Sequence, residues 1–187
     1  MRSVISAILI VLFFNFLACK DPFRTRRPQG SGVQEGHWEF PTTPEITIKN
    51  LYWAYNEKII SNYITCFADN FRFSPSSADS ALYPDRFANW DLEIEIEVTR
   101  AIFARDTLIL MLTYDQAHHD IISDTLATLY RHYTVVAVPS ASAPSESPAT
   151  GVAVFYLVRA QTGRWLIYLW KDEPERGSWG LLKQEFR

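Results

Sequence analysis

The stretch LYWAYNEKIISNYITCFADNFRF, residues 51–73, decides the fold because it passes from a helical to a strand-like pattern. Two apolar stripes recur at helical spacing here. The first starts just before the stretch and consists of Ile48, Leu51, Tyr52 and Tyr55; the second consists of Ile59, Tyr63 and Phe67. The stripes predict two short helices joined near residues 56–58. The segment FRFSP, residues 71–75, then predicts a brief strand that ends at Pro75.

A helix start signal lies just before this stretch. Thr43 is a suitable N-cap, Pro44 fits the first helical position, and Glu45 places a negative charge in the first turn. We therefore expect one folded domain over residues 43–187.

The segment NWDLEIEIEVTRAIF, residues 89–103, is compatible with either a helix or a strand. Apolar and acidic residues alternate from Asp91 to Val98, as in a half-exposed strand, yet Trp90, Val98 and Ile102 also share one helical stripe. Periodicity does not choose between the two. The acidic residues suggest paired catalytic carboxylates or a solvated face, and we expect a solvated face.

From residue 106 onward the pattern is that of β-strands. Four β-branched and aromatic runs follow one another, over residues 107–120, 125–138, 151–160 and 164–172. Gln161, Thr162 and Gly163 predict a tight hairpin between the last two runs, and residues 139–150 form a low-complexity loop. A helical half followed by antiparallel strands predicts an α+β domain.

The N-terminus has the features of an export signal. Arg2 is followed by an apolar run from Val4 to Leu17, and small Ala18 stands directly before Cys19. This arrangement resembles a bacterial lipoprotein signal, which implies a signal peptide over residues 1–18 and lipidation of Cys19. Residues 19–42 are then a flexible linker, rich in Gly, Pro and charge. The alternatives are an ordinary secretory signal or an N-terminal anchor.

The residue after the lipidated cysteine suggests a location. Lys20 in this position resembles lipoproteins that are passed to the outer membrane, so we expect a bacterial cell-envelope protein, lipid-anchored and facing the periplasm. Lipidation of Cys19 leaves Cys66 without a disulfide partner. The apolar neighbours of Cys66 indicate a buried structural thiol rather than a nucleophile.

Charge argues against nucleic acid as a partner. The chain has 187 residues and a formal net charge of -3, and its basic cluster of Arg24, Arg26 and Arg27 lies outside the expected domain. Phosphate binding requires clustered Lys and Arg on the folded surface.

Two segments resemble the nuclear transport factor 2-like superfamily, which includes ketosteroid isomerase and polyketide cyclases. Residues 51–73 are similar to its helix-turn-helix-strand opening, and TGRWLIYLWKD, residues 162–172, is similar to its final hairpin. SWGLLKQEF, residues 178–186, also resembles bacterial lipoproteins with this domain. The resemblance covers about residues 44–187. It implies a cone-shaped fold of N-terminal helices packed on a curved antiparallel sheet.

The same resemblance tests for isomerase chemistry. Where ketosteroid isomerase has its aspartate base, this chain has Ser74 or Pro75, and where it has its oxyanion-hole tyrosine, this chain has Leu51. The isomerase mechanism is therefore not transferred, and we assign no catalytic residue. We also expect no cofactor.

Four residues form a candidate pocket: Tyr114, His118, Tyr130 and His132. They stand at alternating positions of two neighbouring predicted strands and could share one face. If that face lines the cone, the group is a small-molecule site; otherwise it is an exposed or dimer-forming outer face. His118, His119 and Asp120 resemble metal ligands, but adjacent strand residues point to opposite faces, so we expect no metal site.

The segment WLIYLW, residues 165–170, is apolar on both faces of its predicted strand, which indicates that the outer face is covered by a second subunit or by the C-terminal segment. Our hypothesis is a membrane-anchored, non-catalytic domain that binds a small hydrophobic ligand or a protein partner. One alternative is an enzyme that acts on a small hydrophobic substrate by proton transfer, with His118 or His132 as base. Another is a structural homodimer.

Overall fold

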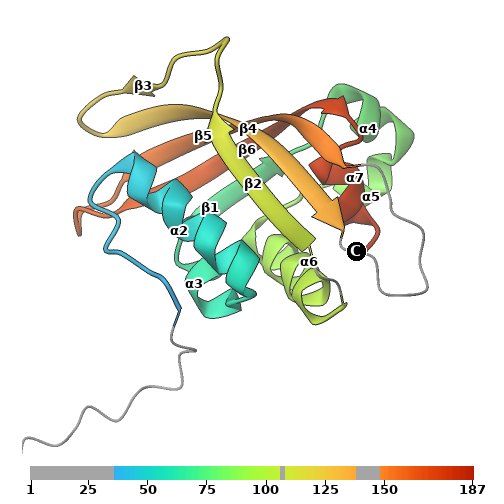
Figure 1. The fold of residues 1–187 in the computed structure, drawn as a ribbon, viewed down its shortest axis with the longest axis horizontal. Coiled ribbons are helices and arrows are strands. Elements are labelled where there is room, and N and C mark those ends of the chain that lie inside the picture. Colours follow the sequence, from blue (N-terminus) through green and yellow to red (C-terminus); the bar gives the residue numbers. More distant parts are fainter. Residues whose placement is uncertain (1–35, 106–107, 138–147) are drawn as a thin grey trace, which may run out of the picture. The chain divides into compact units, whose positions relative to one another are not determined.

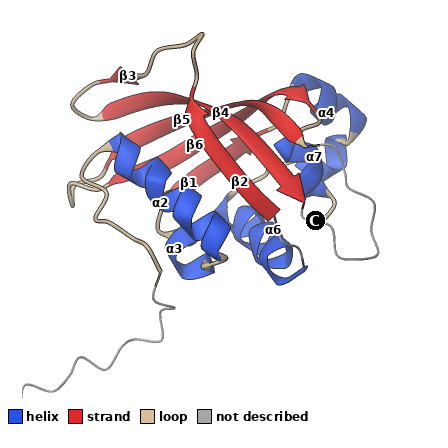
Figure 2. Cartoon of the chain, in the orientation of Figure 1, coloured by secondary structure: helices blue, strands red, loops and turns tan. Residues whose placement is uncertain are grey.

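The computed structural model shows a curved sheet with its main helices packed against the concave side (Figures 1 and 2). It describes residues 36–105, 108–137 and 148–187. The predicted signal peptide, Cys19 and most of the linker lie outside the described residues. The helices are α2 (Pro44–Glu57), α3 (Ile60–Ile64), α4 (Ser77–Leu82), α5 (Pro84–Phe87), α6 (Leu92–Arg105) and α7 (Trp179–Gln184).

The described strands form one six-stranded sheet in the order β1-β6-β5-β4-β2. They are β1 (Phe67–Ser74), β2 (Leu108–Tyr114), β3 (Ile121–Ile122), β4 (Leu126–Ala137), β5 (Ala149–Arg159) and β6 (Trp165–Arg176). The first strand runs parallel to β6, and the other pairs are antiparallel. The short β3 pairs with the start of β4. The α+β class predicted from the sequence is confirmed.

The predicted helix boundaries are confirmed by the caps. The hydroxyl of Thr43 accepts a hydrogen bond from the N–H of Ile46 and caps α2. Lys58 ends this helix in the left-handed conformation, with φ of 59°, and its N–H bonds back to the carbonyls of Ala54 and Tyr55. The chain therefore breaks between α2 and α3 at the predicted place.

Residues 92–103 of the ambiguous segment belong to a helix, α6, and residues 89–91 precede it. Val98 and Ile102 are buried on the same side of this helix, so its helical stripe faces the core. The prediction of a solvated acidic face is wrong for Glu95, which is also fully buried. Glu93 and Glu97 are exposed, as predicted.

Several strand boundaries differ from the prediction, among them the end of β6 at Arg176 rather than at residue 172. The first strand begins at Phe67, four positions before the predicted start, because Phe67 already pairs with Ile167 of β6. The second ends at Tyr114 rather than at residue 120, because the Asp115 carboxylate accepts the N–H groups of Ala117 and His118 and turns the chain.

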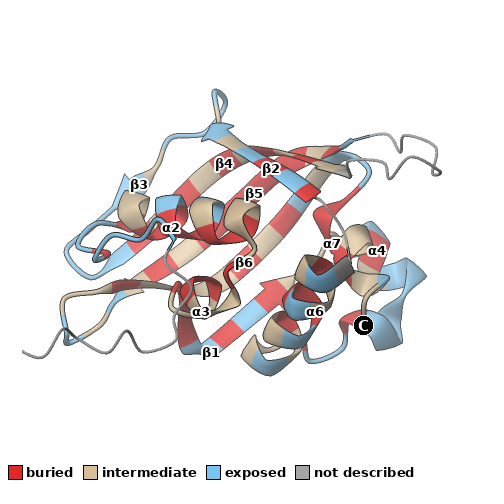
Figure 3. Cartoon of the chain, turned by 60° about the horizontal axis from the view of Figure 1, so that its bottom comes forward, coloured by how far each residue is buried: buried red, intermediate tan, exposed pale blue. Residues whose placement is uncertain are grey.

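Alternation along the long strands separates the two faces of the sheet (Figure 3). On β4 the concave-face residues are buried, and they include Leu129, Tyr133 and Val135. Tyr130 and His132 lie between them on the convex face. The chain before α2 also packs on the domain. The Glu39 carboxylate pairs with Lys49, and the backbone N–H of Glu39 donates to the side chain of Asn50. The indole N–H of Trp38 donates to the hydroxyl of Thr65. Trp38 and Glu39 fall in the range predicted as linker, residues 19–42.

Candidate functional site

The interior, meaning the space between the concave sheet face and the helices, is filled by side chains of the C-terminal helix. Trp179 of α7 is fully buried. The centre of its ring lies 4.4 Å from the ring centre of Trp170, 5.3 Å from that of Tyr133 and 5.4 Å from that of Tyr55. Of the two covers predicted for the outer face of residues 165–170, a second subunit or the C-terminal segment, the latter is therefore wrong: the C-terminal segment enters the interior.

A buried ion pair lies beside these rings. Lys183 of α7 donates to Glu95 of α6 at 2.7 Å, and neither side chain is exposed. The same carboxylate accepts the Tyr63 hydroxyl at 2.5 Å and the Trp90 indole at 2.8 Å. Three donors thus replace the water that the carboxylate has lost.

The ammonium group of this pair is also held by aromatic faces. The Lys183 Nζ lies 3.5 Å from the centre of the Trp170 ring and 4.3 Å from that of Phe73. Burial lowers the pKa of Lys183, and the neighbouring Glu95 carboxylate opposes that shift. Burial, followed by the charge of Glu95, raises the pKa of Tyr63.

A second buried carboxylate fixes the start of α7. Asp172 accepts hydrogen bonds from the Tyr133 hydroxyl at 2.7 Å, the Ser178 hydroxyl at 3.0 Å and the Gly180 N–H at 2.8 Å. Burial raises the pKa of Asp172, while these donors and Lys183 act in the opposite direction. The charged groups of the interior are therefore engaged with one another in stabilising the fold.

The positions that correspond to the catalytic residues of ketosteroid isomerase contain no comparable groups. Leu51 is fully buried in the core, and Ser74 is the last residue of β1. Cys66 is buried, which raises the pKa of its thiol to about 12 and leaves it protonated and unreactive.

The four predicted pocket residues are divided between the two faces of the sheet. His118 lies in the loop after β2, bonds to Asp115 at 2.7 Å and stacks on the Tyr130 ring at 5.0 Å. His132 lies on the same convex face and contacts Glu175 at 3.2 Å. Three of the four are therefore on the outer face.

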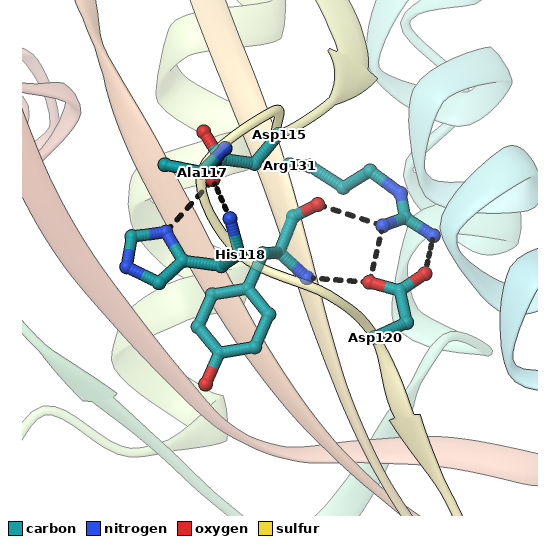
Figure 4. Close-up of polar contacts among 6 residues, drawn as sticks. Asp115, Ala117, His118, Asp120 and Arg131 are labelled. Carbon is teal, nitrogen blue, oxygen red and sulfur yellow. Dashed lines mark hydrogen bonds and ion pairs between the residues drawn. The ribbon is translucent and has the colours of Figure 1, made fainter.

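Tyr114 belongs to the opposite, concave face. It stands directly across from Arg131 of β4, and the guanidinium lies 4.3 Å from the centre of its ring. Figure 4 shows the side chains of His118 and Arg131 pointing in opposite directions. Arg131 is in turn held by both carboxylate oxygens of Asp120, each at 2.8 Å.

A groove between α2 and β2 is the site that the sequence did not predict. It has a volume of about 300 Å³ and contains Tyr114 together with other residues of both elements and β4: Glu45, Ile48, Lys49, Tyr52, Leu112, Thr113 and Arg131. Its surface is mainly apolar, and Tyr52 and Tyr114 are exposed at its sides. An apolar concavity with a few polar groups is the usual composition of a binding site.

One face of α2 runs along the edge strand β2 and forms one side of the groove. Glu45, Ile48 and Tyr52 recur at helical spacing along α2, and Asn56 continues this face and bonds to β2. No sequence signal marks the groove: Tyr52 counts with the apolar stripe of its helix, yet it is 37% exposed, and its proximity to Tyr114 depends on the packing of α2 on the sheet.

Metal ligation and membrane spanning have no support in the described ranges. Within residues 36–105, 108–137 and 148–187, no group of three or more potential ligand side chains is placed to hold an ion. The Asp120 carboxylate is used by Arg131. Among the helices that the structure describes, none combines the length and apolarity needed to cross a bilayer.

Solved structures share this architecture. A conserved protein from Planctomyces limnophilus aligns with a TM-score of 0.58 and 12% identity, over 70% of this chain and 93% of that chain. A ketosteroid isomerase-like protein from Erwinia carotovora atroseptica aligns with a TM-score of 0.52 and 16% identity, over 70% and 92%. A protein from Kribbella flavida aligns with a TM-score of 0.57 and 14% identity, over 74% and 92%.

The chain has the nuclear transport factor 2-like fold. No family model matches the sequence, and no curated protein matches it. At these identities the structural likeness concerns the fold alone, because this fold supports many unrelated functions. The function must therefore be argued from the groove, the interior and the surface.

The interior ion pair makes a testable prediction. Replacing Lys183 by Met leaves the buried Glu95 carboxylate without its counter-charge, and should lower the free energy of unfolding by about 3–5 kcal/mol in urea titrations. Adding Glu95→Gln to Lys183→Met removes the uncompensated charge and should recover most of that loss. Lys171→Met, at a half-buried position on the convex face, is the control. Equal losses in the single and double variants would contradict this account.

Proposed function

We propose that this protein is a lipid-anchored, non-catalytic binding domain of the bacterial cell envelope, and that it binds an apolar ligand in the groove between α2 and β2. The observation that carries the proposal is the combination of a filled interior with an open apolar groove at its margin. A pocket enclosed by the sheet would need the volume that Trp179 and Lys183 occupy.

The distribution of titratable groups supports a binding function over catalysis. His118 and His132, the bases of the enzymatic alternative, lie on the convex face and bond to Asp115 and Glu175. Neither lines the groove between α2 and β2. The charged groups of the groove are largely neutralised, since Arg131 pairs with Asp120 and Lys49 pairs with Glu39.

The anchoring part of the proposal comes from the N-terminal sequence. The apolar run to Leu17 and the small residue before Cys19 support lipidation of that cysteine, and Lys20 supports delivery to the outer membrane. Two or three acyl chains hold a protein at a bilayer durably. The domain would then present the groove to the periplasm.

A second candidate function is homodimerisation through the convex face. Ile109 and Met111 of β2 are 45% and 48% exposed on that face, and the half-buried Tyr156, Tyr168 and Leu169 of β5 and β6 lie farther along the same face. Exposed apolar area of this kind is typical of an interface. A structural dimer is also compatible with the filled interior.

Groove binding is tested with Nile red, a neutral dye whose fluorescence rises in apolar sites. We expect saturable binding, weakened about fivefold by Tyr52→Ser, because an aromatic contact contributes about 1 kcal/mol. Tyr83→Ser is the matched control, since Tyr83 is 38% exposed, close to the 37% of Tyr52, and lies outside the groove. Equal affinities in the two variants would argue against the groove.

Dimerisation is tested by sedimentation velocity with a chain that begins at residue 36. We expect the native domain to sediment as a dimer and Met111→Glu as a monomer, because a charge at this exposed apolar position opposes burial in an interface. Leu82→Glu, at a 65% exposed apolar position of α4 outside the sheet, tests whether any added charge has this effect. A native monomer throughout the micromolar range excludes this candidate.

The anchor is tested with the full chain expressed in a Gram-negative bacterium. The native protein should sediment with membranes and carry acyl mass on its N-terminal peptide, whereas Cys19→Ser should lose the acyl mass and fractionate differently. Cys66→Ser serves as the control for removal of a thiol. Identical fractionation of the native and Cys19→Ser proteins, without acyl mass, would show that the lipoprotein assignment is incorrect.

A further inference from the structure

The second strand forms an edge of the sheet, and its outward hydrogen-bonding groups can be assigned from the ladder. It pairs with β4 on one side only in the described sheet. The N–H of Asp115 donates to the carbonyl of Tyr130, which continues the ladder just beyond the strand. Because hydrogen-bonded and non-hydrogen-bonded positions alternate, the backbone groups of Leu110, Leu112 and Tyr114 face away from β4.

Side chains from the end of α2 occupy the first part of this edge. The carboxamide of Asn56 accepts the N–H of Leu110 at 2.9 Å and donates to the carbonyl of the same residue at 3.0 Å. Lys58 donates to the carbonyl of Leu108 at 2.8 Å. The Asn56 amide thus makes the two bonds that one residue of a neighbouring strand would make.

The next positions on the edge lack this cover. Among the described residues, no side chain bonds to the backbone of Leu112 or Tyr114, and here the helix presents Ile48 and Tyr52 across the groove. The outward groups of Leu112 and Tyr114 recur about 7 Å apart, the two-residue repeat of a strand. The groove therefore combines an apolar wall with a row of free backbone donors and acceptors.

We propose that the groove binds an extended peptide, which adds a strand to the edge of β2 at Leu112 and Tyr114 and continues the pairing that Asn56 begins. This inference rests on the proposed function and specifies its ligand class. Backbone hydrogen bonds would provide affinity, and alternate apolar side chains would enter the groove between α2 and β2.

The charges of the groove select the peptide further. Lys49 and Arg131 have carboxylate partners, whereas Glu45 has no ion-pair partner among the described residues. The unbalanced charge of the groove is therefore negative, and a peptide with a basic residue complements it. A small hydrophobic molecule would leave the spaced backbone groups of Leu112 and Tyr114 without bonds.

The inference is tested with the synthetic peptide acetyl-Arg-Val-Thr-Val-Thr-amide, labelled with fluorescein and measured by anisotropy against the full chain. We expect saturable binding that Leu112→Pro weakens about tenfold, because proline removes an outward N–H and leaves the ladder to β4 intact. Leu112→Ala keeps that N–H and should weaken binding less. The same peptide with both valines N-methylated should bind about tenfold more weakly, because in an antiparallel pair the residues whose side chains enter the groove are those that bond to Leu112 and Tyr114.

The Nile red assay separates the possible failures. If Nile red binds in a Tyr52-dependent way and the peptide does not bind, the peptide inference is overturned and the groove remains a small-ligand site. If neither probe binds, the proposed function fails as well. Equal binding of the native and N-methylated peptides would also overturn strand addition. Circular dichroism and urea unfolding of Leu112→Pro confirm its fold; if it is unfolded, the N-methylated peptide decides the question.

Discussion

The buried pair of Glu95 and Lys183 is the interaction on which the arrangement of this domain depends. It joins α6 to α7, and its two residues are 88 positions apart in the chain. A helix as short as α7 has little stability of its own, so tertiary contacts must hold it. Burying two charges is unfavourable unless their hydrogen bonds are satisfied, and here Tyr63 and Trp90 complete the carboxylate.

The use of the buried charged groups in stabilising the fold bears on function. Strongly shifted pKa values often indicate catalytic groups, but here Lys183 and Tyr63 both bond to the buried Glu95, and Asp172 is held by Tyr133, Ser178 and Gly180. The aromatic contacts of Trp179 then occupy the space that the fold could offer to an internal ligand. The open groove lies at the margin of the sheet, where α2 covers only part of the edge of β2.

Much of the architecture could be predicted from local signals. The cap at Thr43, the break after Glu57 and the runs of β4 to β6 depend on residues close in sequence, and the structure confirms them. The early start of β1 depends on a parallel partner far along the chain. The turn after Tyr114 depends on one carboxylate, that of Asp115, which no periodicity indicates.

The candidate site was less accessible to such reasoning. Extending β2 to residue 120 placed His118 on a strand and joined it to Tyr114, whereas the turn at Asp115 sends the two to opposite faces. Glu95 had the same polar appearance as Glu93 and Glu97, and its burial follows from the position of Lys183. The groove combines residues of α2, β2 and β4, which are distant in sequence.

The sequence by itself determined the α+β class and the start of the first helix, because periodicity and caps act within a few residues. It also carries the signal-like N-terminus that motivates the anchoring proposal. Only the tertiary structure decided that α7 fills the interior, that Glu95 is buried and that the edge of β2 lies partly free. Those outcomes require charges, rings and strand edges to meet across the chain, and the pairing of distant groups is set by packing rather than by local pattern.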